Sequence, residues 1–158
     1  MAFFTAAEAL EMAMEIEKNG KVFYDAVAAQ ATDVSVRVLF EELAAQEQRH
    51  YAVFQAMAEN ASESPQPLTE YDEYQAYLKA ALDSALFAGP DKALAMARQA
   101  QDRLTALRMA IGFEKDTLLF FYDLRDMAGA VEHKAVDSII QEEKQHLRRL
   151  ANLLSSSK

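Results

Sequence analysis

The sequence contains no cysteine and little glycine or proline, and each shortage narrows the range of structures. Without cysteine the chain cannot form disulfides, zinc–thiolate sites, or cysteine-bound iron–sulfur or rubredoxin-type centres. Only 4 glycines and 3 prolines occur among 158 residues, beside abundant Ala, Leu, Glu and Met, which favours helices over sheets. The composition therefore predicts one all-α domain spanning residues 1–158.

Long apolar runs and basic clusters are also lacking. No segment has the roughly 18 uncharged apolar residues of a membrane-spanning helix, so we expect no membrane partner. The N-terminal residues lack the basic region and long apolar run of a signal peptide, and together with the absence of cysteine this leads us to expect a cytoplasmic protein. The formal net charge of −9 argues against nucleic acid as a partner, because phosphate binding needs a basic patch.

Apolar residues recur at helical spacing in four long segments, at about 5–30, 33–59, 102–128 and 131–154. The short link before the second segment, with Asp33 as its N-cap, makes the first two helices antiparallel neighbours. Residues 60–101 form a long crossover, in which we expect helical segments at about 70–87 and 91–100. The pattern predicts a four-helix bundle of two antiparallel hairpins.

The segment 70–87 carries a stripe of tyrosine and leucine that includes Tyr71, Tyr74, Leu78 and Leu82. Such a stripe is typical of a helix packed on the bundle. It would also suit a dimer interface, because aromatic helices outside a four-helix core make good contact surfaces. Both interpretations stay open from the sequence.

The motif Glu-x-x-His occurs twice, at Glu47–His50 and Glu143–His146, and each copy follows a lone Glu on an earlier helix. Glu17 lies 30 residues before Glu47, and Glu114 lies 29 before Glu143. Residues i and i+3 share one face of a helix, so each motif presents a carboxylate and an imidazole together. Two such halves provide four carboxylates and two imidazoles, the ligand set with which four-helix bundles hold two metal ions.

Apolar residues flank both motifs in register. Leu43 and Ile139 each lie four residues before the motif Glu, and Phe54 and Leu150 each lie seven after it. The motif carboxylates are therefore in line with core positions. Unpaired buried carboxylates are very costly, and four of them balance the charge of two divalent ions. The alternative, solvated helix faces with i,i+3 surface contacts, does not account for this register.

Tyr24 lies seven residues after Glu17, two turns along the same helix face. It is either a core tyrosine with a satisfied hydroxyl or a hydrogen-bonding or redox partner of the metal site. The remaining polar candidates lack the motif or point away from it, and we expect them on the surface: His133, Glu142, Glu41 and Glu42.

The two halves of the chain also resemble each other. Glu17-Lys18 is repeated as Glu114-Lys115, and the repeat period is close to 97 residues. This period is too long for a solenoid and fits a duplicated helix hairpin.

With these motifs the chain resembles the ferritin-like diiron-carboxylate proteins, and it is most similar to the rubrerythrin branch over residues 5–154 apart from the 60–100 connection. The fold implied is a ferritin-like four-helix bundle. The resemblance implies six metal ligands: Glu17, Glu47, His50, Glu114, Glu143 and His146. The Glu of each motif would bridge two metal ions, each lone Glu would bind one ion, and each His would bind through one ring nitrogen. The implied cofactor is a pair of Fe ions, with Mn or Zn as substitutes.

The resemblance also implies an activity, since members of that family react Fe²⁺ with O₂ or peroxide. We therefore expect a diiron peroxidase or ferroxidase that uses O₂ or H₂O₂, draws on an external electron donor and forms a homodimer or a larger homo-oligomer. Two alternatives remain, namely non-enzymatic iron binding, storage or buffering in a ferritin-like assembly, and a bundle whose metal only stabilises the fold. The chain departs from the family pattern in having Thr117 where a further Glu is usual, no iron–thiolate domain and a longer connection between its halves.

Overall fold

The computed structural model describes residues 6–61, 80, 88–127 and 130–156, and this part of the chain is helical without strands. Its helices are α1 (Ala6–Gln30), α2 (Val34–Glu59), α4 (Pro90–Gln99), α5 (Arg103–Met127) and α6 (Ala130–Ser155). The corresponding predicted ranges were 5–30, 33–59, 91–100, 102–128 and 131–154. The predicted helical segment 70–87, with its tyrosine stripe, lies outside the described residues apart from Ala80.

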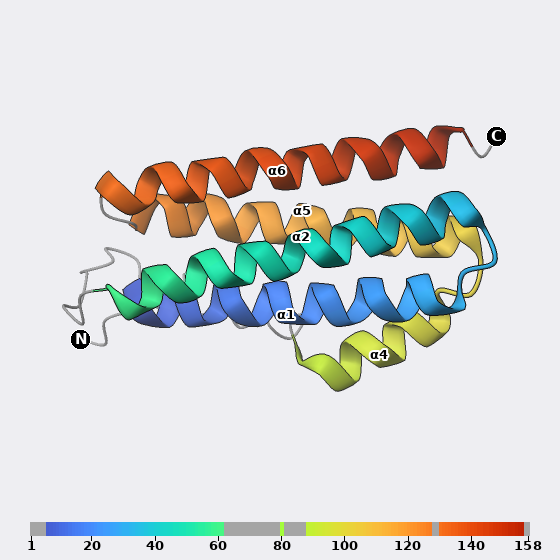
Figure 1. Cartoon of the computed structure of the whole chain (residues 1–158), viewed down its shortest axis with the longest axis horizontal. Helices are drawn as coiled ribbons and strands as arrows, with labels where there is room; N and C mark the ends of the chain where they lie inside the picture. The colour runs from blue at the N-terminus through green and yellow to red at the C-terminus, as the bar shows by residue number, and fades with distance from the viewer. Residues whose placement is uncertain (1–5, 62–79, 81–87, 128–129, 157–158) are drawn as a thin grey trace.

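The four long helices form a bundle of two antiparallel hairpins (Figure 1). Helices α1 and α2 pack together along their length, as do α5 and α6, and the two hairpins meet through the pairs α1 with α5 and α2 with α6. The predicted all-α four-helix bundle is therefore confirmed. None of the described helices combines the length and the apolarity that crossing a membrane would require.

Helix α4 packs on the outside of α1, toward the C-terminal end of α1 (Figure 1). It begins after Gly89, whose φ of +116° suits glycine, and has Pro90 in its first turn, where a missing N–H costs nothing. The side-chain amide of Gln30 donates to the carbonyl oxygens of Ala97 at 2.5 Å and Ala100 at 3.2 Å. These bonds tie the end of α4 to the end of α1.

Asp33 and Arg103 join three helix ends at one end of the bundle. Asp33 is the N-cap of α2, as predicted, and its carboxylate accepts a hydrogen bond from the backbone N–H of Val36 at 3.0 Å. Arg103 donates to the other carboxylate oxygen of Asp33 at 2.5 Å and to the carbonyl of Leu153 in α6 at 3.1 Å. The Val36 N–H and the Arg103 guanidinium together hold the pKa of Asp33 below its usual range.

Large apolar side chains fill the space between the four helices, because each helix turns one apolar stripe inward. Fully buried members include Phe23, Phe40, Leu43, Phe54, Leu107, Phe121, Ile140 and Leu150. Polar side chains interrupt this core at one level of the bundle, and they include both Glu-x-x-His motifs.

Candidate metal centre

The structure brings all six predicted ligand residues together in the middle of the bundle. Helix α1 contributes one carboxylate, α2 a carboxylate and an imidazole, α5 one carboxylate and α6 a carboxylate and an imidazole. Each of these residues is at most 2 % exposed: Glu17, Glu47, His50, Glu114, Glu143 and His146. Residues up to 129 positions apart in sequence thus share one buried cluster.

The six residues form two overlapping groups of four, in each of which the potential ligand atoms lie within 4.8 Å of one another. One group, called the His50 position, consists of Glu17, Glu47, His50 and Glu143. The other, called the His146 position, consists of Glu47, Glu114, Glu143 and His146. Glu47 and Glu143 belong to both groups, so the carboxylate of each motif lies between the two positions.

Both imidazole rings turn Nδ1 toward the carboxylates. Nδ1 of His50 lies 2.8 Å from Glu143 Oε1 and 3.6 Å from Glu17 Oε1. Nδ1 of His146 lies 3.0 Å from Glu143 Oε2 and 3.5 Å from Glu114 Oε1. The two rings stack with centroids 5.7 Å apart and planes inclined by 17°. One nitrogen of each ring therefore faces the cluster and the other faces away.

The outward nitrogen of each His contacts a side chain on the opposite hairpin. Nε2 of His50 lies 3.0 Å from Oε2 of Glu142 on α6, and Nε2 of His146 hydrogen-bonds to Oε1 of Gln46 on α2. From the sequence we expected Glu142 on the surface, pointing away from Glu143. The expectation that it would therefore lie outside the site was wrong, because it contacts His50. Its side chain is 36 % exposed, but the rotation that takes it away from Glu143 carries it toward α2.

Several buried ligand atoms in the cluster have no hydrogen-bond partner. They are both carboxylate oxygens of Glu17 and Glu47, Oε2 of Glu114, Oε1 of Glu143 and Nδ1 of His50. His50 Nδ1 and Glu143 Oε1 are close, yet their contact lacks hydrogen-bond geometry. Buried polar atoms are normally paired, so a converging set of unpaired carboxylate and imidazole atoms fits divalent metal ions. This mixture of oxygen and nitrogen ligands suits Fe or Mn.

A family model for rubrerythrin matches residues 8–154. The chain belongs to the rubrerythrin family. Among curated proteins no sequence matches it. A crystal structure of a Thermotoga maritima protein, provisionally described as a ferritin-like diiron-carboxylate protein, is similar at 23 % identity and a TM-score of 0.72. The likeness covers 100 % of this chain and 99 % of that one, and it establishes the ferritin-like fold.

Burial, followed by repulsion between carboxylates, governs the electrostatics of this rubrerythrin-family cluster. Burial, and then the charge of Glu143, raise the pKa of Glu17 well above its ordinary value. Burial and the charge of Glu17 do the same for the pKa of Glu47. The pKa of Glu114 rises to about 8 through burial and the charge of Glu143. Glu114 is therefore mostly protonated at neutral pH unless a cation replaces the proton, and the pKa values of Glu17 and Glu47 are shifted in the same direction.

The two imidazoles partly offset this repulsion. Burial by itself would lower the pKa of His50, but the close contact with the negatively charged Glu143 outweighs it and raises the pKa to about 9. Burial is likewise outweighed at His146, where Glu114 and Glu143 raise the pKa to about 10. Glu143 would have its pKa raised by burial, but its close polar contacts with Glu114, His146 and His50 lower it below the usual range. In the metal-free protein, protonated imidazoles therefore balance part of the negative charge of the carboxylates.

Tyr24 is fully buried, and its hydroxyl donates a hydrogen bond to Oε1 of Glu114. Its ring packs edge-on against Phe40, with centroids 5.2 Å apart, and against Phe113 at 6.0 Å. Burial first, and the nearby charge of Glu114 second, raise the pKa of Tyr24, so the hydroxyl keeps its proton. Tyr24 thus combines the two roles that the sequence left open, as a core aromatic and as a hydrogen-bonding partner of a predicted ligand.

Thr117 lies one turn after Glu114, where the rubrerythrin family usually has a further Glu. It is fully buried, and its hydroxyl has no hydrogen-bond partner in the described part of the chain. The position is therefore polar, but it contributes no carboxylate to the cluster.

The other polar candidates lie outside the cluster. The side chain of His133 is 45 % exposed, with Nδ1 3.2 Å from Asp137 four residues on. Glu41 and Glu42 are exposed, and Glu42 pairs with Arg149 across the α2–α6 seam. The sequence predicted all three to be on the surface.

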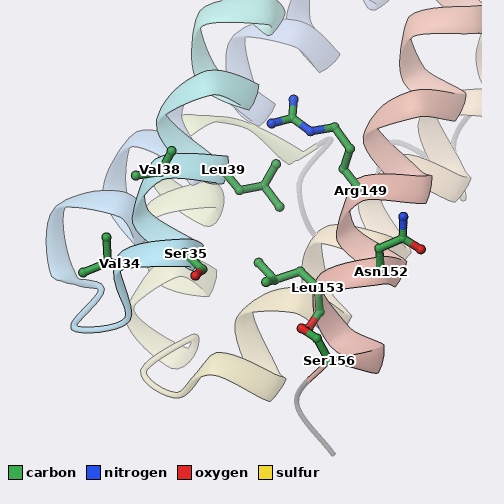
Figure 2. A pocket seen from close by; sticks show the side chains of 8 residues that line it. All are labelled: Val34, Ser35, Val38, Leu39, Arg149, Asn152, Leu153 and Ser156. Carbon is green, nitrogen blue, oxygen red and sulfur yellow. The ribbon is translucent and has the colours of Figure 1, made fainter.

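An open groove lies between the first turns of α2 and the last turns of α6 (Figure 2). Leu39 and Leu153 face each other across it, with Arg149 along its rim. None of the six predicted ligands lines this groove, so it is separate from the Glu/His cluster.

Proposed function

We propose that this rubrerythrin-family protein is a diiron-carboxylate oxidoreductase that oxidises Fe²⁺ with H₂O₂ or O₂ and serves in defence against peroxide. The observation that supports it is the pair of overlapping four-residue groups that share Glu47 and Glu143. Shared carboxylates bring two cations close together, and four carboxylates balance two divalent charges. A single isolated metal would not require this duplication.

The chain's residues would prepare the site in three ways. Glu47 and Glu143 would bridge the two positions, while Glu17 and Glu114 would each bind at one of them. The imidazoles would present Nδ1, because their Nε2 atoms are held by partners on the opposite hairpin. The surrounding apolar side chains exclude bulk water, which strengthens every charge interaction inside.

The redox chemistry itself would come from the bound iron, with O₂ or H₂O₂ as the oxidant. Electrons for repeated turnover would come from an external donor, because a chain without cysteine cannot carry an iron–thiolate centre of its own.

The test begins with metal-free protein loaded with Fe²⁺ under anaerobic conditions. We expect about two iron ions per chain, followed by Fe²⁺ oxidation when H₂O₂ or O₂ is added and monitored by stopped-flow absorbance. The Glu47→Ala variant removes a carboxylate from both positions and should lose iron binding and oxidation. Glu41→Ala, an exposed Glu on the same helix, is the matched control and should behave as wild type.

The same experiment separates the competing functions. Repeated turnover with peroxide supports an enzyme, whereas retention of many more than two irons per chain in a large assembly would indicate storage. Sedimentation velocity of the loaded protein gives the assembly size, for which we expect a homodimer or larger. Tight Zn²⁺ binding without any Fe-dependent oxidation would contradict both iron functions.

A further inference from the structure

The two halves of the cluster are related by a constant sequence offset, which makes it possible to compare their surroundings residue by residue. Glu47 and Glu143 are 96 positions apart, and so are Gln46 and Glu142. Gln46 and Glu142 each precede a motif Glu, and each contacts the Nε2 atom of the His on the other hairpin. The two contacts join corresponding atoms, but one partner is an amide and the other a carboxylate.

This difference between amide and carboxylate changes how strongly Nδ1 of each imidazole can bind a metal ion. Both partners accept the Nε2–H hydrogen and so leave the Nδ1 lone pair for a metal. A carboxylate acceptor polarises the ring more strongly than an amide, because the hydrogen bond is charge-assisted. It thereby raises the basicity of Nδ1. The higher pKa of His146 in the metal-free cluster comes from Glu114 and Glu143, whose negative charges bound cations would neutralise. With those charges balanced, the outer partner distinguishes the rings, so His50, backed by Glu142, is the stronger ligand and His146, backed by Gln46, is the weaker one.

A second asymmetry acts in the same direction. Glu17 and Glu114 are 97 positions apart, and so are Tyr24 and Phe121. The Tyr24 hydroxyl donates to Oε1 of Glu114, which draws negative charge away from that carboxylate. Phe121 is buried but has no hydroxyl to donate, and both oxygens of Glu17 are without a hydrogen-bond partner. A metal that replaces the proton of Glu17 therefore meets a carboxylate that shares none of its charge with a hydrogen-bond donor.

From these two asymmetries we infer that the two metal positions are unequal. The His50 position binds a divalent cation more tightly and fills first, and Glu142 and Gln46 are the positioning residues that set this order. The inference rests on the proposed dimetal function, since it presupposes that the cluster binds metal.

Besides His50, Arg49 also forms an ion pair with Glu142. Its guanidinium lies 3.8 Å from Oε2 of Glu142, and its side chain is 65 % exposed. Exposed ion pairs of this kind are weak because water screens them. The Arg49 contact is therefore the weaker of the two at Glu142, and the carboxylate stays available to Nε2 of His50, which lies closer, at 3.0 Å.

The test uses Co²⁺ as the probe and calorimetry of metal-free protein as the readout, so that no redox activity is needed. Wild-type protein should show two steps of different affinity. His146→Ala should keep the tighter step and His50→Ala should lose it, which assigns the steps to positions. Glu142→Gln, nearly identical in shape, should weaken the tighter step by about 10–100-fold.

Reciprocal and charge controls distinguish this effect from a structural defect. Gln46→Glu should strengthen the weaker step, and the double variant Glu142→Gln/Gln46→Glu should reverse the order of filling, which a purely structural disturbance would not do. Glu41→Gln removes one exposed negative charge from α2 and should leave both steps unchanged.

Two equal steps in wild type, or unchanged steps in Glu142→Gln, would overturn the inference while leaving the metal centre intact. A wild-type chain that binds no Co²⁺ and no Fe²⁺ would overturn the proposed metal centre and this inference with it.

Discussion

The carboxylate of Glu47 on α2 rests directly against the backbone of Gly20 on α1. A Cβ atom at residue 20 would lie 2.7 Å from Oε2 of Glu47 and 2.7 Å from Cζ of Phe113. Contacts this short do not occur, so only glycine leaves the Glu47 side chain where it is. Glycine is costly inside a helix, and at this position the cost is offset by room for a carboxylate that belongs to both four-residue groups.

Gly20→Ala should therefore weaken metal binding much more than it weakens the metal-free fold. The added methyl group would push aside the end of the Glu47 side chain, and we expect at least a tenfold loss of Co²⁺ or Fe²⁺ affinity. Alanine is the better helix former by about 1 kcal/mol, which offsets part of the crowding in the metal-free protein. Calorimetric metal titration and thermal unfolding of the same sample measure the two effects.

Gly112→Ala is the matched control, because a Cβ there would meet nothing within 4 Å. It should stabilise α5 by about 0.5–1 kcal/mol and leave metal affinity unchanged. Equal metal affinities in Gly20→Ala and Gly112→Ala would contradict the role assigned to Gly20.

The metal-free protein should lose stability as the pH rises from about 6.5 to 9. The pKa of His50 is raised to about 9 and that of His146 to about 10, so the stability they contribute is complete below their ordinary pKa of 6.5 and lost as pH rises through the folded values. Glu114, with its pKa raised to about 8, acts in the same direction, because its ionised form is unfavourable in the fold. Each pKa unit for one group corresponds to about 1.4 kcal/mol.

Urea unfolding in the presence of a chelator at several pH values measures this loss. Saturating metal should flatten the profile between pH 6.5 and 9, because bound cations replace the protons that hold the cluster together. An unfolding free energy that increases over this interval in metal-free protein would contradict the electrostatic account.

Removing metal should lower the melting temperature without abolishing the fold. The apolar core, including Phe23, Phe40, Leu107 and Ile140, is buried independently of the Glu/His cluster, so helical circular dichroism should persist in a chelator. A metal ion at 100 times its dissociation constant adds about 2.7 kcal/mol per site. Glu47→Ala should show no such gain, and collapse of the helical signal on chelation would instead indicate a metal-dependent fold.

Because Asp33 both caps α2 and pairs with Arg103, we expect Asp33→Ala to lose more stability than Asp33→Asn. Asp33→Ala removes both the N-cap of α2 and the contact with Arg103, and it should cost about 0.5–2 kcal/mol for the cap alone. Asp33→Asn keeps a capping oxygen and loses only the ion pair, which is worth about 0.2–1 kcal/mol when partly exposed. Denaturant unfolding of both variants checks the order, and equal losses would show that the cap contributes nothing.

The helices and the set of residues in the candidate site were predictable from the sequence, because both follow from the spacing of residues along a single helix. A period of 3.6 residues aligns Leu43, Glu47 and His50 on one face of α2, and Ile139, Glu143 and His146 are aligned likewise on α6. Burial then follows from the apolar members of each stripe. Four stripes must meet in a bundle, so the six polar side chains that interrupt them must meet as well.

The contacts around the six residues were not predictable from this spacing. Glu142 meets His50 across 92 positions, Gln46 meets His146 across 100, and Tyr24 meets Glu114 across 90. Each contact depends on how far one helix is rotated and shifted against another. Glu142 was misjudged for this reason, since pointing away from Glu143 on its own helix does not mean pointing into solvent.

The sequence by itself determined the helices, the pair of Glu-x-x-His motifs and the duplicated order of their partners, because hydrophobic periodicity and residue spacing act within one helix. Only the tertiary structure decided which residues contact the outer nitrogen of each His. The partner is the carboxylate of Glu142 at His50 and the amide of Gln46 at His146. It also decided that Gly20 makes room for Glu47. The physical reason is that the rotation and offset between helices are set by the packing of side chains across the whole bundle.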